Sequence, residues 1–301
     1  MDRFESMSVF VAAVEAGSLS AAARRLGTPL ATVSRKVSEL EAHLKTRLLN
    51  RSSRRVTLTD TGRDYVAACR RILEEVGEAE RAASGEFSAP RGHLVLSAPI
   101  VFGRLHLLPI VTAFLDAYPE IDVRLALADR AVNLIEEHVD AALRIGALAD
   151  SGMAALKVGE IRRVICGSPA YLKAHGRPQK PADLGRHHCI TFEGLQSPAG
   201  WLFPAKKGEQ SVPIRSRLVV NTAEAAVDAA VAGLGLTRVL SYQVAAARAA
   251  KKVMLVLEEF EPPPLPVNLV HAGGRLLPLK LRAFLDFAAP RLRAVLSPDS
   301  L

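Results

Sequence analysis

Apolar side chains recur at helical spacing from the start of the chain. Within residues 2–16, apolar positions follow one another at the spacing of one helix face, and Asp2 and Glu5 have the spacing of a capping box. Gly17 is expected to end this helix because glycine adopts a positive φ at little cost. The pattern therefore predicts an amphipathic helix over residues 2–16.

Two further helices are predicted on either side of Gly27. Ser18 or Ser20 can cap the first, and Thr28 as N-cap with Pro29 at the first helical position begins the second. The buried stripe of the second helix would contain Leu30 or Val33, followed by Val37, Leu40 and Leu44. Two short helices joined through a glycine are the geometry of a helix-turn-helix.

A basic turn and a short strand pattern follow the third helix. Val56 and Leu58 alternate with Thr57 and Thr59, which is the period of a strand. The stretch from Asn50 to Arg55 is polar and basic. We interpret this segment as the wing of a winged helix-turn-helix.

A long helix is predicted over residues 60–84, with Thr59 as its N-cap. Its narrow apolar stripe consists of Val66, Cys69, Leu73, Val76 and Ala83. Because a lone helix with one stripe has no core of its own, we expect it to pair with its twin in a dimer that presents two recognition helices. The alternative is that the stripe packs on the chain's own next domain.

Positive charge is concentrated in the same part of the chain. The formal net charge is +8 and the pI about 9.7, which permits an anionic partner without naming one. Between Ser20 and Leu58, nine basic residues stand against two acidic ones, a local balance of +7. This concentration favours a phosphate-binding face, and the alternative is a solvated basic face on an ordinary helical domain.

Several stretches of this part resemble the LysR-type transcriptional regulators. The matching segments are Phe10–Leu26, Val33–Val37, Leu48–Arg51 and Thr57–Gly62, and the likeness continues at the level of domains through almost the whole chain. The resemblance implies a dimer through the linker helix and often a tetramer through the sensing domains. It also implies recognition of double-stranded DNA through the third helix and a minor-groove arginine on the wing.

Position by position, the resemblance assigns Ser34 and Arg35 to the helix contacts and Arg54 to the wing arginine. The glutamine that the family commonly uses for base contact is replaced by Leu30, which offers only an apolar contact such as a thymine methyl. The full set of expected DNA-binding residues is Ser20, Thr28, Leu30, Ala31, Thr32, Ser34, Arg35, Lys36, Arg51, Arg54 and Arg55.

Beyond a linker-like stretch at 84–92, strand and helix patterns alternate. Strands are expected at 93–97, 123–127, 141–144, 163–166, 189–192 and 218–220, and helices at 103–118, 133–138, 223–232, 242–250 and 279–294. Such alternation predicts α/β layers with mostly parallel pairing.

The expected fold class is α/β, with an N-terminal all-α winged helix-turn-helix, a long linker helix and a two-lobed effector domain. The two lobes, with a cleft between them, resemble periplasmic solute-binding proteins. The predicted divisions are 1–59 for the DNA-binding domain, 60–90 for the linker helix and 91–301 for the effector domain. Within the effector domain, 91–161 and 268–301 would form the first lobe and 162–267 the second, with hinges near 160–162 and 266–268.

Candidate effector-binding residues lie where strands end and helices begin, because helix N-termini offer free N–H groups. They are Ser97, Pro99, Ile100, Val101, Phe102, Arg144, Gly146, Asn221 and Thr222, which together predict a pocket for a small anion. The alternative is that the polar residues merely cap helices and that Arg144 pairs with an acid. Related sequences often have Ser or Thr where Val101 stands, which favours a more apolar effector or one held by backbone donors. Small organic acids and aromatics are the candidates.

No catalytic or metal-binding constellation emerges. Adjacent His187 and His188 point in different directions, and no second ligand pair has a zinc-like spacing. Ser168-Pro169 near His175 lacks a nucleophile turn and an acid partner. We therefore expect no enzyme activity, no metal and no cofactor.

The few cysteines and the lack of long apolar segments indicate the cellular compartment. Cys69, Cys166 and Cys189 form no close-spaced set, which suits a reducing environment. The charged N-terminus has no signal core, and no uninterrupted apolar run approaches the roughly 18–20 residues of a membrane span. A cytoplasmic protein without a membrane partner is expected.

Three functional hypotheses follow. The leading one is a homodimeric or homotetrameric regulator whose DNA geometry changes when a small molecule closes the cleft, with RNA polymerase as a further candidate partner. A solute-binding protein would explain residues 91–301 but not the basic head. The third is an effector-independent architectural DNA binder whose α/β part serves only oligomerisation.

Overall fold

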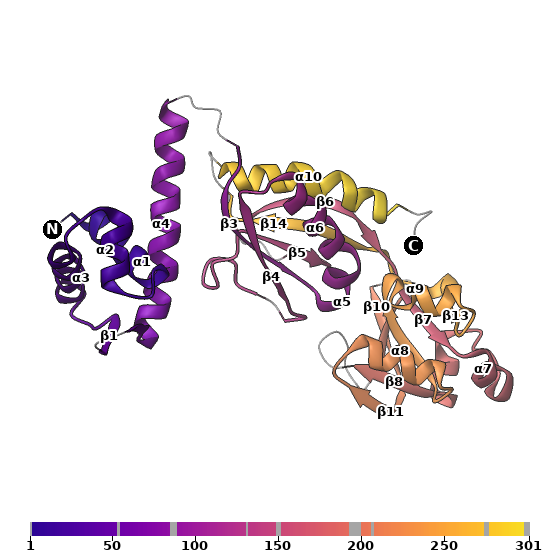
Figure 1. Ribbon diagram of the computed structural model, residues 1–301. Coiled ribbons are helices and arrows are strands. Elements are labelled where there is room, and N and C mark those ends of the chain that lie inside the picture. Colours follow the sequence, from indigo (N-terminus) through magenta and orange to yellow (C-terminus); the bar gives the residue numbers. More distant parts are fainter. Residues whose placement is uncertain are drawn as a thin grey trace. The chain divides into compact units, whose positions relative to one another are not determined.

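The structure is a computed structural model that describes residues 2–52, 55–84, 89–130, 132–148, 152–192, 200–205, 208–273 and 277–297. The chain divides into two compact units, Met1–Ala89 and Pro90–Leu301 (Figure 1). The first unit is helical with one hairpin, and the second contains two five-stranded sheets.

The first unit, the head, packs its helices and hairpin around one core. Its elements are α1 (Arg3–Glu15), α2 (Leu19–Leu26), α3 (Leu30–Leu44), β1 (Leu49–Ser52), β2 (Arg55–Leu58) and α4 (Asp60–Ser84). Asp2 caps α1 with a 3.2 Å hydrogen bond, and Ser18 caps α2 with one of 3.1 Å. Of the two serines considered for the second cap, Ser18 has the role and Ser20 is exposed. Gly27 ends α2 with the expected positive φ, 60°.

The start of α3 differs from the prediction, because Pro29 and not Thr28 is the N-cap and the helix begins at Leu30. The Thr28 hydroxyl donates to the Leu26 carbonyl at 3.1 Å. A threonine hydroxyl that is satisfied within the turn does not cap the helix, which accounts for the one-residue shift. Val33 is fully buried whereas Leu30 is exposed, so the buried stripe of α3 begins at Val33.

The apolar stripe of α4 is divided between two environments. Val66 and Cys69 are buried in the head core with apolar residues of α1 and α3. Leu73 and Val76, which continue the stripe, are half-buried, and the side chain of Ala83 lies outside the described residues. The expectation that the whole stripe faces a twin helix was therefore wrong for its first two members, which pack on the head itself.

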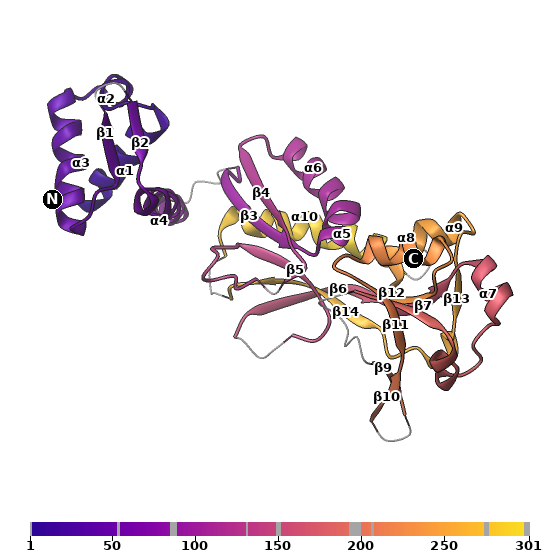
Figure 2. The same cartoon turned by 90° about the horizontal axis from the view of Figure 1, so that it is seen from below.

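Two mixed sheets form the second unit, one in each lobe (Figure 2). The first has the order β4 (Ile121–Leu127), β3 (Gly92–Ala98), β5 (Ala141–Ile145), β14 (Leu265–His271) and β6 (Ala154–Ile161). The second has the order β11 (Arg215–Val220), β8 (His188–Phe192), β12 (Leu236–Leu240), β7 (Arg163–Gly167) and β13 (Met254–Val256). A separate hairpin, β9 (Gly200–Pro204) with β10 (Glu209–Pro213), packs Trp201, Phe203 and Val212 into a core of the second lobe.

Half of the pairings in the two large sheets are antiparallel, so the prediction of mostly parallel pairing was wrong. β3 pairs in parallel with β4 and β5, and β8 with β11 and β12. β14 pairs antiparallel with β5 and β6, and β7 with β12 and β13. The chain passes between the lobes from β6 directly into β7 and returns in β14. Parallel neighbouring strands need a crossover connection, usually a helix. A strand that enters a sheet from the other lobe has no such connection and can therefore pair antiparallel.

The two chain crossings between the lobes lie near the predicted hinges. The first falls at Arg162, between β6 and β7. The second falls earlier than predicted, because Leu265, Pro266 and Val267 already pair with β6 of the first sheet. These three residues therefore belong to the first lobe and not, as predicted, to the second.

Helices cover the sheets on the faces that the strands leave apolar. In the first lobe these are α5 (Ile100–Phe102), the π-helical turn η1 (Gly103–Leu107), α6 (Leu108–Ala117) and α10 (Leu279–Val295). The second lobe has α7 (Pro169–His175), the 3₁₀ turns η2 (Pro181–Arg186) and η3 (Glu258–Phe260), α8 (Ala223–Val231) and α9 (Ser241–Ala249). The predicted helix at 133–138 is a series of turns, because the Asn133 side chain accepts the Ile135 N–H at 3.1 Å.

The stretch Ile100–Ala117 is long and apolar enough to meet the length and composition of a membrane span. The core helix of a folded domain meets the same condition, and this stretch packs Phe102, Leu107 and Phe114 into the core of the first lobe. The helices α1 and α2 meet it only as a pair bent by 118°. Packing within the domain accounts for the apolar composition of these segments.

Candidate DNA-binding face and effector-binding segments

The outer face of α3 carries most of the predicted DNA-contact residues of that helix. Leu30, Ala31 and Arg35 are exposed, and Thr32 and Ser34 are half-buried beside them. On the preceding elements, Ser20 is exposed and Thr28 half-buried. The Arg35 guanidinium lies 2.7 Å from the Glu39 carboxylate one turn along. Exposed pairs of this kind are worth under about 1 kcal/mol, so Arg35 can exchange Glu39 for a phosphate or a base.

Lys36 does not belong to this face. Its ammonium forms an ion pair with the Glu5 carboxylate of α1, and only 14% of its side chain is exposed. One residue along a helix is a rotation of about 100°, which turns Lys36 toward the buried side while Arg35 faces out. The structure therefore separates Lys36 from the other predicted contact residues.

The wing is fastened to α3 by a residue that the sequence prediction did not single out. The Glu41 carboxylate accepts the Leu48 N–H at 2.9 Å and the Leu49 N–H at 3.1 Å, where β1 begins. On the other strand, the Val56 N–H donates to the Gly17 carbonyl at 3.1 Å. These bonds hold the hairpin against α3 and against the turn between α1 and α2. Arg54 lies outside the described residues, and so do the side chains of Arg51 and Arg55.

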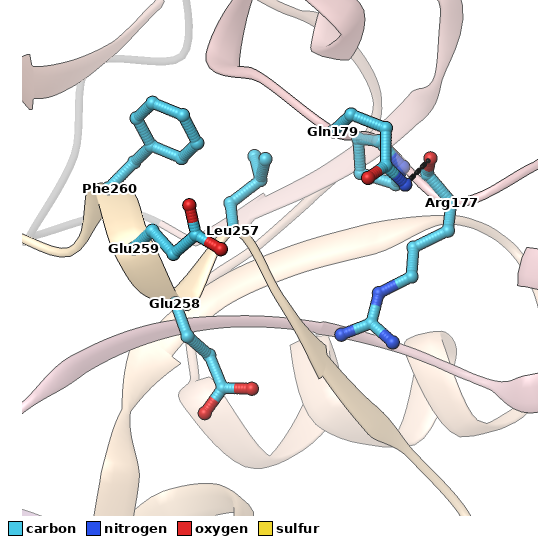
Figure 3. A pocket seen from close by; sticks show the side chains of 7 residues that line it. Arg177, Gln179, Leu257, Glu258, Glu259 and Phe260 are labelled. Atoms are coloured by element: carbon cyan, nitrogen blue, oxygen red, sulfur yellow. Dashed lines mark hydrogen bonds between the residues drawn. The ribbon is translucent and has the colours of Figure 1, made fainter.

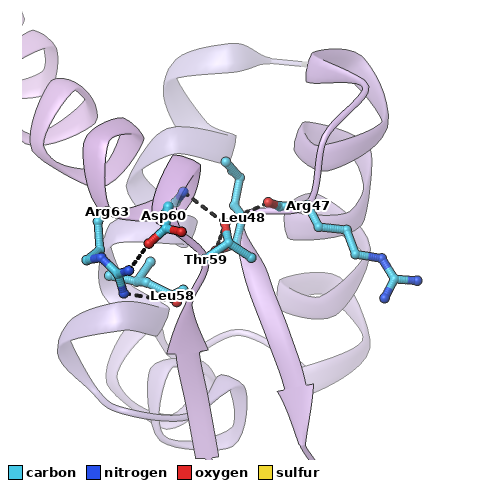
Figure 4. A network of polar contacts seen from close by, with 7 residues as sticks. Arg47, Leu48, Leu58, Thr59, Asp60 and Arg63 are labelled. Atoms are coloured by element: carbon cyan, nitrogen blue, oxygen red, sulfur yellow. Dashed lines mark hydrogen bonds and ion pairs between the residues drawn. The ribbon is translucent and has the colours of Figure 1, made fainter.

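A second network joins the base of the wing to the start of α4 (Figure 4). The Thr59 hydroxyl donates to the Arg47 carbonyl at 2.8 Å and accepts the Gly62 N–H at 3.0 Å, as the predicted N-cap should. The Asp60 carboxylate forms an ion pair with Arg63 in the first turn. A Cβ on Gly62 would stand 2.0 Å from the Leu48 carbonyl oxygen, so only glycine fits this approach. The recognition helix, the wing and α4 thus form one rigid head.

The predicted effector segment after β3 is mostly buried. Ser97 is fully buried, and its hydroxyl has no hydrogen-bond partner in the part of the chain that the structure describes. Pro99 is the N-cap of α5, and the N–H of the exposed Ile100 donates to the Asp129 carboxylate at 3.0 Å. Val101 and Phe102 are core residues. A ligand here would meet the Ile100 side chain and polar groups rather than Val101 or Phe102.

Arg144 is held in place by a backbone carbonyl rather than by an acid. Its guanidinium donates to the Val132 carbonyl at 2.7 Å, and the side chain is half-buried. Burial lowers the pKa of this guanidinium, and the nearby Glu137 carboxylate opposes that shift. Gly146, two residues on, has a φ of +108° and donates its N–H to the Pro266 carbonyl at 2.8 Å. Both residues therefore stay near the end of β5, as predicted.

Asn221 and Thr222 lie at the end of β11, in the sheet of the other lobe. The Thr222 hydroxyl accepts the Ala225 N–H at 3.3 Å and so caps α8, which is the role that the structural alternative gave it. Asn221 is exposed. A different residue of this lobe, Tyr242, contacts the segment after β3.

Tyr242 at the start of α9 packs into the core of the first lobe. Its ring lies 5.2 Å from that of Phe102, at 84°, and 5.9 Å from the His106 imidazole. Burial raises the pKa of the Tyr242 hydroxyl and lowers that of His106. The His106 Nε2 is buried and has no hydrogen-bond partner among the described residues. The hint in the sequence is an aromatic residue two positions after the end of a strand.

Ion pairs connect the two crossings between the lobes. Arg162, on the first crossing, lies 3.4 Å from the Glu261 carboxylate and 3.9 Å from that of Glu258. Both acids precede β14, where the chain returns to the first lobe. We call Arg162, Glu258 and Glu261 the hinge clasp.

The residues that resembled chemical motifs have structural roles. Ser168 caps α7 by accepting the Tyr171 N–H at 3.2 Å. His187 is buried with its Nδ1 3.3 Å from the Tyr171 hydroxyl, and no group of three His, Cys, Asp or Glu side chains within the described ranges could hold a metal ion. Burial raises the pKa of the Cys69 thiol to about 11 and that of Cys189 to about 12, which disfavours the reactive thiolate.

Comparison with known proteins agrees with this architecture. Residues 4–63 match the bacterial regulatory helix-turn-helix protein, lysR family, and residues 88–293 match the LysR substrate binding domain. A transcriptional regulator of Xanthomonas campestris pv. campestris (strain 8004) is 37% identical over 290 residues, which cover 94% of this chain and 84% of that one. The structure of CrgA from Neisseria meningitidis shares 33% identity and a TM-score of 0.61, covering 96% and 98% of the two chains. Full-length AphB of Vibrio cholerae shares 26% identity and a TM-score of 0.60, covering 95% and 98%.

A helix-turn-helix head followed by a two-lobed α/β domain defines a transcription regulator that binds DNA and responds to a small molecule. The chain belongs to the LysR family of bacterial transcriptional regulators.

Proposed function

We propose that the chain recognises its operator through the exposed side of α3, with Arg35 as the principal contact of that helix. The observation that carries this proposal is the division within α3, where Arg35 faces solvent beside small side chains and Lys36 is bound to Glu5. Small neighbours permit close approach to the major groove, and an arginine can contact guanine or phosphate there. Leu30 is exposed beside this face and offers an apolar surface to a thymine methyl.

The wing arginines Arg51, Arg54 and Arg55 complete the proposed interface. Arg51 and Arg55 belong to the hairpin that Glu41 fixes to α3, and Arg54 lies between them in the sequence, which supports a simultaneous contact with the DNA backbone and minor groove. The protein would act in the cytoplasm, with RNA polymerase as a further partner at the promoter.

Oligomerisation is proposed through the second half of α4. The first two members of its stripe are occupied by the head core, and Leu73 and Val76 continue the stripe beyond them. Pairing of two such helices would place two copies of α3 on a symmetric operator. Light scattering of the full chain tests this proposal, because L73E with V76E should yield monomers and the wild type dimers or tetramers.

The effector is proposed to bind between the lobes, near the segments after β3 and β5. Two observations support this position: the Ser97 hydroxyl has no hydrogen-bond partner among the described residues, and the Arg144 guanidinium is anchored on the neighbouring strand of the first sheet. A small organic acid would satisfy both donors. Thermal-shift screening of such acids tests the proposal, since a bound acid stabilises the fold and S97A with R144Q should abolish the shift.

Arg35→Ala tests the DNA-binding proposal. Fluorescence anisotropy with a genomic fragment selected by the wild type should show a loss of about tenfold or more, because a charge-assisted contact contributes about 1.5–3 kcal/mol. Arg124→Ala, which removes an exposed arginine from β4, serves as the matched control and should leave the affinity unchanged. Equal DNA affinities of the wild type and Arg35→Ala would contradict the proposal that α3 contacts the operator through Arg35.

A further inference from the structure

A surface pocket of about 400 Å³ lies in the second lobe, outside the predicted DNA-binding and effector residues. It is lined by Arg177, Pro178, Gln179, Leu257, Glu258, Glu259 and Phe260 (Figure 3). The first three follow α7, and the other four lead from β13 through η3 toward the hinge. Its volume falls within the range of small-molecule sites, about 300–1,000 Å³.

Opposite charges stand on the two sides of this pocket. Figure 3 shows Arg177 and Gln179 on one side and Glu259 with Phe260 on the other. The Arg177 guanidinium donates to the Leu255 carbonyl at 3.0 Å through one nitrogen, which orients the group and leaves its other N–H donors for a ligand. The Glu259 carboxylate has no ion pair within the described ranges. The pocket therefore offers a fixed cation and an uncommitted anion.

The turn that carries Glu258, Glu259 and Phe260 begins with an unusual backbone conformation at Leu257. Leu257 has φ 59° and ψ 32°, the left-handed conformation that a leucine side chain rarely adopts. It persists because the Leu257 side chain is buried in a core of the second lobe. Strained residues of this kind concentrate at ligand clamps and switch regions, where the surrounding structure holds them. Here the strained turn directs the acids and Phe260 to the pocket.

One lining residue also belongs to the hinge clasp. The Glu258 carboxylate lies 3.9 Å from Arg162, which in turn lies 3.4 Å from Glu261. A molecule that occupies the pocket therefore lies beside the group that connects the two crossings. Its binding energy can differ between lobe arrangements, which is what regulation requires.

We propose that this pocket is a second ligand site, which takes a small zwitterion of the amino-acid type and biases the hinge. The ligand carboxylate binds Arg177, its ammonium group binds Glu259, and its side chain lies on Leu257, Pro178 and Phe260. The proposal goes beyond the regulator function proposed above, because the site and its ligand are separate from those between the lobes.

Calorimetry of the full chain with three matched probes tests the ligand class. L-phenylalanine carries both charges, phenethylamine only the ammonium group, and 3-phenylpropionate only the carboxylate. We expect L-phenylalanine to bind with a Kd of about 1 mM or tighter, and both analogues to bind at least about tenfold more weakly. Absence of binding by L-phenylalanine, or equal binding of either analogue, would overturn the proposal.

Variants of the two charged residues locate the site. Arg177→Gln and Glu259→Gln should each weaken L-phenylalanine about tenfold, because each removes one charge-assisted contact. Lys180→Gln and Glu120→Gln, exposed and outside the pocket lining, are the matched controls. Binding that both pocket variants retain would place L-phenylalanine elsewhere and overturn the assignment. Because the readout involves no DNA, its outcome is independent of the operator experiments.

Discussion

The Phe102 and Tyr242 rings meet edge to face, with their centroids 5.2 Å apart, and the contact joins the two lobes. Phe102 ends the segment after β3 where effector contacts are expected, and Tyr242 begins α9 of the other lobe. His106 closes the cluster, 4.9 Å from Phe102. Besides the two chain crossings, the lobes are thus connected through a packed aromatic contact, which any change of lobe closure must disturb.

Loss of the Tyr242 ring should loosen the lobes. Tyr242→Ala removes a buried aromatic side chain, so we expect about 3–5 kcal/mol less stability in urea unfolding, and Tyr242→Phe should lose under about 1.5 kcal/mol. Spin labels at R124C and K180C, one in each lobe, should give one narrow distance distribution in the wild type and a broad one in Tyr242→Ala. Tyr118→Ala, an aromatic deletion confined to the first lobe, should keep it narrow. A narrow distribution in folded Tyr242→Ala would show that the ring does not tether the lobes.

Gly62 should tolerate no side chain. Gly62→Ala places a Cβ 2.0 Å from the Leu48 carbonyl oxygen, so the wing and α4 must separate. We expect about 1–3 kcal/mol less stability of the head and weaker DNA binding, measured by circular dichroism melting and anisotropy. Gly185→Ala is the matched control, because its Cβ would meet nothing within 4 Å and its φ is ordinary. Unchanged melting of Gly62→Ala would contradict the rigid junction.

The Glu41 carboxylate should matter for DNA binding although it faces the protein. Glu41→Ala leaves the Leu48 and Leu49 N–H groups without their acceptor, which destabilises the wing position by about 1–3 kcal/mol. DNA affinity should fall while the overall helix content stays constant. Glu75→Ala, an exposed change on α4, should leave the affinity as in the wild type. Wild-type affinity of Glu41→Ala would mean that the hairpin keeps its position without this bond.

Stability should fall as the pH drops below about 6.5, the ordinary pKa of histidine. Burial, and then the charge of His175, lowers the pKa of His187, whose Nδ1 faces the Tyr171 hydroxyl at 3.3 Å. The unfolded chain therefore binds a proton that the folded chain excludes, and stability is complete above this pH and decreases below it, by up to about 1.4 kcal/mol per pH unit.

Urea midpoints between about pH 7.5 and 5 measure this dependence, across the ordinary histidine pKa. His187→Asn keeps a hydrogen-bond acceptor without the titration and should reduce the slope. The half-buried His106, whose pKa is also lowered, should account for part of what remains. His93→Asn, on the exposed start of β3, should leave the slope as in the wild type. An unaltered slope in His187→Asn would assign the dependence to other groups.

The head could be predicted closely from the sequence because its signals are local. Helical periodicity, glycine turns and the Thr59 cap act within a few residues, and each gave the correct element. The N-cap of α3 was misassigned because the Thr28 side chain can bond either to the N-terminus of α3 or to the Leu26 carbonyl in the preceding turn. The sequence pattern does not show which of the two bonds forms. Lys36 was grouped with Arg35 because both are basic, whereas its ion pair with Glu5 depends on how α1 packs.

The second unit was predicted less well because its elements depend on contacts between distant segments. β6 pairs with β14, which lies far along the chain, and the β9–β10 hairpin packs Trp201, Phe203 and Val212 against residues from distant segments. Val101 and Phe102 follow a strand, as effector contacts should, yet the fold uses them as core. Tyr242, Glu41 and Arg162 acquire their roles only through tertiary neighbours, which no local pattern contains.

Competition binding tests the central claim most directly. The full chain is incubated with fragmented genomic DNA at moderate salt in an excess of random duplex, and the retained fragments are sequenced. Recognition by α3 and the wing predicts strong enrichment of a few fragments that share a symmetric motif, and loss of that enrichment in Arg35→Ala. Retention of all duplexes in proportion to their abundance would contradict it.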